Sequence, residues 1–285
     1  MSSMFPRTEV EELSLSRMII GTNWIGDWSH TSPAADLMIR TKHAQPESIV
    51  PMLKAFMEFG VDTIMAPFGG LTALIKAVRM TEDATGKGMV IIDTPIINVD
   101  NTPEARREAE KTIRAGKDLG AKICLIHHSS AEQLVNKNLK QIVRLDDYTN
   151  MIRDAGMIPG LSAHMPEMVV YSDLNNYDVQ TYIQIYNCMG FLMQVEVETV
   201  NQIIHDAKKP VMTIKPMAAG RTTPFVGLNF SWATIRDCDM VTVGCFNENE
   251  AREDLEISLA ALEHRRAQIE KRSSPNTKQD AFGNK

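Results

Sequence analysis

The chain has 285 residues, of which 44% are hydrophobic and 23% are charged, and its formal net charge is −6. This balance is that of an ordinary globular protein and excludes a disordered or fibrous chain, while the length fits two domains or one (β/α)8 barrel of about 250 residues. The acidic charge, without any block of Lys and Arg, disfavours nucleic acid and anionic membranes as partners.

Short apolar runs of strand composition alternate with helical stretches along the chain. The predicted strands cover Met18–Thr22, Val61–Ala66, Met89–Asp93, Lys122–His127, Met157–Ser162, Tyr182–Met189, Pro210–Lys215 and Asp239–Cys245. The predicted helices cover Ser48–Phe59, Leu71–Thr81, Thr102–Leu119, Leu145–Ala155, Val197–Ala207, Leu228–Arg236 and Glu248–Lys271.

The strand runs are continuously apolar, which is typical of parallel strands that are covered on both faces. Eight such strands alternating with helices predict a closed (β/α)8 barrel, formed as one domain by residues 1–271. A doubly wound sheet is less favoured, because no GxGxxG motif follows the first strand. We expect the polar residues 272–285, which contain Pro and Gly, to form a flexible tail.

The cysteines and the ends of the chain bear on its location. None of the four cysteines forms a CxxC pair, so we expect free thiols in a reducing compartment. The first residues lack the basic start and apolar core of a signal peptide, and no apolar run reaches 18 residues. These features predict a cytoplasmic protein with no membrane partner. The polar tail and long last helix are compatible with a homo-oligomer.

Polar residues at the carboxyl ends of the predicted strands are the candidate site residues, because barrel enzymes place their chemistry there. The catalytic candidates are Asp93, His127, His164 and Lys215. The candidates for binding a small-molecule substrate are Asn23, Trp24, Trp28, His128, Asn187, Glu196 and Arg221. The two tryptophans, in one loop, suit stacking on the face of a sugar.

Each candidate also has a structural interpretation. His127 could be a satisfied core histidine, and Asp93 could cap a turn. Lys215 could form a salt bridge across the barrel mouth, and Glu196 could simply favour the positive end of a helix. The tryptophans could be packing residues.

The residue types leave three chemistries open. Asp93, His127 and His164 could ligate a divalent metal, although no HxxxH-type spacing supports this. Without a metal, the same residues offer a histidine acid or base that is oriented by a carboxylate, with Lys215 stabilising developing negative charge. A Schiff base at Lys215 is the third option.

Five segments resemble the aldo-keto reductases, in the order and spacing of that superfamily. They are LSRMIIGTNWIGDW (Leu15–Trp28), LIHH (Leu125–His128), GLSAH (Gly160–His164), IKPMAAGR (Ile214–Arg221) and VTVGCFNENEAREDLE (Val241–Glu256). The resemblance spans roughly residues 15 to 265 and implies a (β/α)8 barrel.

The resemblance does not extend to the catalytic residues. Aldo-keto reductases use Asp, Tyr, Lys and His to pass a hydride from NADPH to a carbonyl. The Asp position holds Met65, Phe68 stands in place of the Tyr, and Pro95 in place of the Lys; only His127 matches. A phenylalanine has no hydroxyl to donate, so the usual proton relay cannot operate.

The cofactor positions are also depleted. Ser162 and Gln184 match residues that hold the nicotinamide amide in the family, but the partner Asn is Ala163. The basic cluster expected after the eighth strand is replaced by a mostly acidic segment that keeps only Arg252, which disfavours NADPH with its 2′-phosphate.

These observations favour a non-redox barrel enzyme, a lyase, isomerase or hydrolase, that acts on a sugar-like or hydroxy-carbonyl substrate by histidine acid/base chemistry. One alternative is a divergent NAD(P)H-dependent reductase, in which Ser162 and Gln184 would bind the cofactor. The other is a non-catalytic binding protein. The cluster of polar groups at one mouth argues against the latter, because such groups are costly unless they are used.

Overall fold

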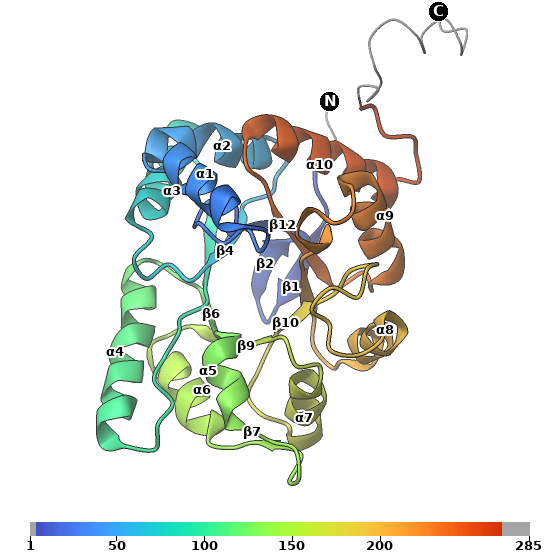
Figure 1. Cartoon of the computed structure of the whole chain (residues 1–285). Coiled ribbons are helices and arrows are strands. Elements are labelled where there is room, and N and C mark those ends of the chain that lie inside the picture. Colours follow the sequence, from blue (N-terminus) through green and yellow to red (C-terminus); the bar gives the residue numbers. More distant parts are fainter. Residues whose placement is uncertain (1–3, 270–285) are drawn as a thin grey trace, which may run out of the picture.

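Eight parallel strands close into a barrel in the order β10-β11-β12-β3-β4-β5-β6-β9, with helices around it (Figure 1). The structure, a computed structural model, describes residues 4–269. The barrel strands are β3 (Met18–Gly21), β4 (Thr63–Ala66), β5 (Val90–Asp93), β6 (Ile123–Ile126), β9 (Ile158–Ala163), β10 (Tyr182–Ile185), β11 (Val211–Ile214) and β12 (Met240–Gly244). Each lies within a predicted strand run or overlaps it, which confirms the (β/α)8 barrel.

The helices cover the outside of the barrel. They are α1 (Pro33–Lys42), α2 (Val50–Glu58), α3 (Thr72–Thr85), α4 (Pro103–Asp118), α5 (His128–Ala131), α6 (Leu145–Asp154), α7 (Glu167–Asn175), α8 (Val197–Asp206), α9 (Pro224–Thr234) and α10 (Glu248–Leu262). Short 3-10 turns occupy Pro46–Ser48, Glu132–Leu134 and Ala218–Gly220. The seven predicted helices are present; α1, α5 and α7 are additional.

Four predicted boundaries are wrong by four residues or more, among them the helix end predicted at Thr81, which lies at Thr85, and the helix start predicted at Leu228, which lies at Pro224. The strand predicted to reach Met189 ends at Ile185, because Asn187 organises a turn by accepting hydrogen bonds from the backbone N–H groups of Met189 and Phe191. The helix predicted to reach Lys271 ends at Leu262, and residues 263–269 are not helical. Lys271 itself and the tail predicted over residues 272–285 lie outside the described residues.

An N-terminal hairpin, which was not predicted from the sequence, closes the barrel at the amino-terminal ends of its strands. Its strands are β1 (Arg7–Val10) and β2 (Leu13–Ser16), and a second short hairpin pairs β7 (Val135–Asn136) with β8 (Gln141–Ile142). Val10 and Leu15 are buried and pack with the inward-facing residues of the barrel strands. The hairpin therefore extends the core of the barrel at its amino-terminal end.

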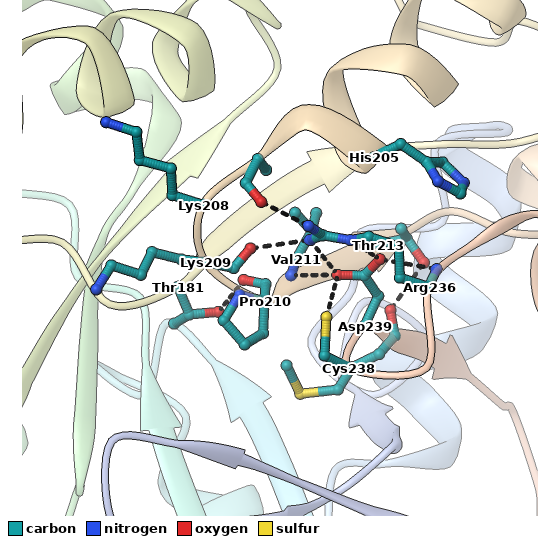
Figure 2. Close-up of polar contacts among 12 residues, drawn as sticks. Thr181, His205, Lys208, Lys209, Pro210, Val211, Thr213, Arg236, Cys238 and Asp239 are labelled. Carbon is teal, nitrogen blue, oxygen red and sulfur yellow. Dashed lines mark hydrogen bonds and ion pairs between the residues drawn. The ribbon is translucent and has the colours of Figure 1, made fainter.

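An ion pair between Asp239 and Arg236 joins β11, β12 and the segment after α9 at the amino-terminal end of the barrel (Figure 2). Asp239, immediately before β12, is completely buried and accepts hydrogen bonds from the Arg236 guanidinium and from the backbone N–H of Val211. The guanidinium of Arg236 also donates to the carbonyl oxygens of Ala207 and Lys209. The buried Asp239 carboxylate is therefore both paired and hydrogen-bonded, the condition under which a buried charge is tolerated.

The four cysteines are free thiols in the structure, in agreement with the prediction, and Cys124 and Cys245 are buried. Within residues 4–269, no helix has both the length and the apolar composition to cross a bilayer.

Candidate functional site

A cavity of about 550 Å³ opens at the carboxyl ends of the barrel strands. Eight of the predicted site residues line it: Asn23, Trp24, Trp28, His127, His128, Ser162, His164 and Lys215. Met65, which stands where the aldo-keto reductases carry their catalytic Asp, also lines this cavity. The position that would tune a proton donor in those enzymes therefore presents an uncharged thioether here.

Three imidazoles that follow β6 and β9 are in contact with one another in the cavity lining. The ring centroids of His127 and His128 are 4.2 Å apart, and those of His128 and His164 are 3.6 Å apart with the planes tilted by 18°. The Glu132 carboxylate fixes the backbone on the β9 side, because it accepts hydrogen bonds from the N–H groups of His164 and Met165. The predicted convergence of His127 and His164 is therefore present, with His128 between them.

The hydrogen bonds of His127 assign its tautomer. Its Nδ1 lies 2.8 Å from the Ser129 hydroxyl oxygen and accepts the Ser129 backbone N–H at 3.3 Å. Since Nδ1 is an acceptor, the proton of the neutral ring is on Nε2. Burial, and to a lesser extent His128, lowers the pKa of His127 to about 4. Burial likewise lowers the pKa of His164 to about 3, so both imidazoles are neutral at pH 7.

Lys215 and His30 form the opposite part of the site. The Lys215 Nζ is 2.9 Å from His30 Nε2, and His30 Nδ1 is 2.9 Å from the carbonyl oxygen of Trp28. The carbonyl accepts the Nδ1 proton of a neutral ring, so Nε2 accepts a hydrogen bond from the lysine. Burial lowers the pKa of Lys215 to about 8. His30 lies in the same loop as the predicted binding residues Trp24 and Trp28 but was not itself among the predicted site residues.

Lys215 does not form the salt bridge that was the alternative interpretation. Within residues 4–269, no carboxylate forms an ion pair with its ammonium group, and burial alone accounts for its lowered pKa. A lysine in a cavity with only a neutral imidazole as its polar partner is available to a ligand.

Asp93 is not part of this site. It is 4% exposed and its Oδ1 accepts the backbone N–H of Phe68. A Cβ placed on Gly116 of α4 would lie only 2.3 Å from Asp93 Oδ2, so the carboxyl group lies between the barrel and α4. The predicted metal set of Asp93, His127 and His164 is therefore not brought together, and no group of three metal-ligating side chains is arranged for a metal within residues 4–269.

The burial of Asp93 leads to a prediction on stability. Burial raises the pKa of Asp93 to about 6, so the folded state favours the protonated acid, and stability is lost as the pH rises from about 4 through about 6. An asparagine at this position cannot ionise, so the unfolding free energy of Asp93→Asn does not fall in this way. The difference in unfolding free energy between Asp93→Asn and the wild type is therefore expected to increase by about 3 kcal/mol in favour of the variant from pH 4 to pH 8. Urea denaturation across this range measures the effect. The exposed Asp83→Asn is the matched control, and parallel pH profiles for Asp93→Asn and wild type would contradict the prediction.

Three further predicted binding residues lie outside the cavity lining. Asn187 is fully buried and holds the loop after β10 through its side-chain amide. Glu196 is exposed at the start of α8 and lies outside the cavity lining. The Arg221 guanidinium stacks over the ring of Phe191 at 3.9 Å and donates to the carbonyl oxygen of Ala218. Asn187 and Arg221 thus contact neighbouring loop residues, and none of the three belongs to the cavity wall.

The two predicted cofactor positions are not equivalent. Ser162 lines the cavity, whereas Gln184 is completely buried, lies outside the lining and donates to the carbonyl oxygen of Ile185. The cavity also reaches α10, where its lining includes Glu250, Glu253 and Asp254. The acidic segment noted in the sequence therefore faces the cavity itself.

No protein-family model matches the chain, and no curated protein matches it in sequence. Among solved structures it is similar to a candidate aldo-keto reductase of Pseudomonas aeruginosa, with 14% identity and a TM-score of 0.63, over 90% of this chain and 94% of the other. An aldo-keto reductase of Klebsiella pneumoniae in complex with NADPH has 14% identity and a TM-score of 0.57, over 94% and 92%.

The same barrel also occurs with a different chemistry. Orotidine 5′-monophosphate decarboxylase of Methanocaldococcus jannaschii has 13% identity and a TM-score of 0.50, over 84% of this chain and 97% of the other. Identities this low establish the architecture and leave the activity to the site residues. The chain therefore has the fold of the aldo-keto reductases, an eight-stranded parallel barrel, in a strongly divergent sequence.

Proposed function

We propose that the protein is a non-redox enzyme, a lyase or isomerase, that moves a proton next to the carbonyl group of a small hydroxy-carbonyl substrate. The observation that carries this proposal is the convergence of the neutral imidazoles of His127 and His164 with Lys215 on one cavity. Neutral imidazoles are in the protonation state of a general base, and a lysine ammonium stabilises an enolate oxygen.

The roles of the residues follow from their protons. His127 carries its proton on Nε2 and can donate it to a substrate oxygen. His164 accepts the proton from the substrate carbon, and an enolate formed beside it would raise the low pKa of its imidazole. Trp24 and Trp28 line the same cavity and offer apolar faces to the carbon skeleton.

The test is hydrogen exchange at the substrate carbon. Dihydroxyacetone, glycolaldehyde and a set of aldoses are incubated with the enzyme in D₂O, and proton NMR follows the signal next to the carbonyl. We expect enzyme-dependent loss of that signal without any nicotinamide. A set of substrates that show no exchange above the buffer control would overturn the proposal.

A divergent NAD(P)H-dependent reductase is the second candidate, favoured by the similarity to the NADPH-bound reductase and by the reach of the cavity to α10. The carboxylates of Glu250 and Glu253 would repel a 2′-phosphate at that end, which disfavours NADPH. Carbonyl-dependent oxidation of NADH or NADPH, followed by absorbance, separates this candidate from the first. We also propose a cytoplasmic location and a homo-oligomeric state, both from the sequence.

A further inference from the structure

We propose that Lys215 is a nucleophile that forms a covalent imine with the carbonyl carbon of the substrate. The inference rests on the proposed function, because it requires a carbonyl compound in the same cavity. It assigns the substrate to the aldehydes and ketones. Lys215 would then form a covalent bond to the substrate instead of stabilising an enolate oxygen by its charge.

The backbone turns Lys215 into the cavity against the alternation of its strand. Met212 of β11 belongs to the inner core and Ile214 lines the cavity, so the next residue of a regular strand would face the helices. Lys215 instead adopts a φ of +62°, in the left-handed region, although it precedes Pro216. Such a conformation costs about 1 kcal/mol and is found where the surrounding structure enforces it, often at functional sites.

The segment after Lys215 is held firmly in this conformation. The Lys215 carbonyl accepts the backbone N–H of Ala218 at 2.8 Å, and Ala218 and Ala219 also have positive φ. The helix α9 packs closely against the turn, since a Cβ on Gly227 would lie 2.4 Å from the carbonyl oxygen of Pro216. The packed backbone thus directs the Lys215 side chain into the cavity, where Nζ contacts His30.

The polar surroundings favour the neutral amine that an attack on carbon requires. The partner of Nζ is the Nε2 lone pair of His30, which can also take a proton from it. A carboxylate partner would hold the ammonium form, and none forms an ion pair with this lysine in the described part of the chain. With a pKa of about 8, half of the Lys215 side chains are neutral at pH 8, against well under about 1% for an ordinary lysine.

The step balances with the groups of the cavity and with water. The neutral Nζ attacks the carbonyl carbon, His30 takes a proton from the nitrogen and passes it to the carbonyl oxygen, which becomes a hydroxyl, and the Nε2–H of His127 stabilises that oxygen by a hydrogen bond without giving up its proton. A further proton converts that hydroxyl into leaving water, and the nitrogen lone pair forms the C=N bond. In sum, amine, carbonyl and one proton give a protonated imine and water. The imine then accepts electrons from the neighbouring C–H or C–C bond as His164 takes or returns the proton.

Reductive trapping tests the proposal. The full chain is incubated with dihydroxyacetone, glycolaldehyde or pyruvate in the presence of cyanoborohydride, which reduces an imine to a stable secondary amine. Mass spectrometry of peptides locates the adduct. We expect one dominant adduct on Lys215, absent in Lys215→Arg, which keeps the charge but not the nucleophile. Lys208→Arg, at an exposed lysine that hydrogen-bonds the Asp173 carbonyl oxygen and the Asn176 side chain, is the matched control and keeps the adduct.

The pH dependence adds a readout that a structural role would not move. Trapping on Lys215 is expected to rise about thirtyfold from pH 6.5 to a plateau above about pH 9, whereas surface lysines continue to gain reactivity beyond pH 10. Adducts spread evenly over surface lysines, or no Lys215 adduct with any of the three probes, overturn the inference. Deuterium exchange without trapping supports the proposed function and refutes only the imine. Trapping without exchange supports the imine on Lys215 and refutes the proposed proton transfer.

Discussion

Replacing Asp239 by alanine is expected to lower the free energy of unfolding by about 3–5 kcal/mol. The carboxylate is completely buried, and its removal leaves the Arg236 guanidinium without its ionic partner and the Val211 backbone N–H without an acceptor. The Arg236 guanidinium is only 20% exposed, and a largely desolvated charge left without its partner is one of the few single changes with so large a cost.

Chemical denaturation of Asp239→Ala and of Asp237→Ala measures this effect. Asp237 is the matched control, because its side chain is fully exposed and 3.8 Å from the buried Arg17, whose guanidinium keeps its hydrogen bonds to the carbonyl oxygens of Asp239 and Arg236, so the loss of Asp237 should cost less than about 1 kcal/mol. The double variant Arg236→Met with Asp239→Leu should recover part of the loss, since it removes both charges. Equal losses for the two single alanine variants would show that the buried pair contributes no special stability.

Replacing His164 by glutamine is expected to lower the rate of deuterium exchange at the substrate carbon by about 10²- to 10⁴-fold. Glutamine keeps a polar side chain but cannot accept and release a proton at neutral pH. The Glu132 contacts to the backbone N–H groups at 164 and 165 do not involve the imidazole, so the local backbone is expected to persist.

The control for His164→Gln is His205→Gln. His205 is in the last turn of α8, outside the cavity lining, and its ring contacts the Thr234 carbonyl oxygen. We expect His205→Gln to keep the wild-type exchange rate. Thermal melts of both variants separate a catalytic loss from unfolding. Exchange by His164→Gln within a factor of three of wild type would assign the base role to another group.

The barrel could be predicted because its strands are apolar throughout, and continuous runs such as Ile123–Ile126 leave little choice of structure. The histidine cluster followed from strand order, since β6 and β9 are neighbours. Asp93 could not be placed, because its orientation depends on strand parity. Ile92 faces the inner core, so Asp93 points outward, and a sequence with uncertain strand ends does not show this.

Lys215 illustrates the opposite case. In a regular strand, the alternation of side chains would point Lys215 away from the cavity. Its side chain enters the cavity because Lys215 adopts a left-handed conformation, which is disfavoured for a residue before a proline. His30 has a similar positive φ of 59° in an irregular loop. The lysine–histidine contact therefore depends on two backbone conformations that propensity argues against, which is typical of sites rather than of scaffolds.

The buried ion pair at the foot of the barrel has a consequence for how such a chain can change over time. The residues that hold β11 and β12 together at their amino-terminal ends take no part in lining the cavity at the other end. Substitutions around the mouth can therefore accumulate without undermining the scaffold, so a lineage with this architecture is free to drift from one reaction to another. An experimenter could graft new mouth loops onto this barrel for the same reason.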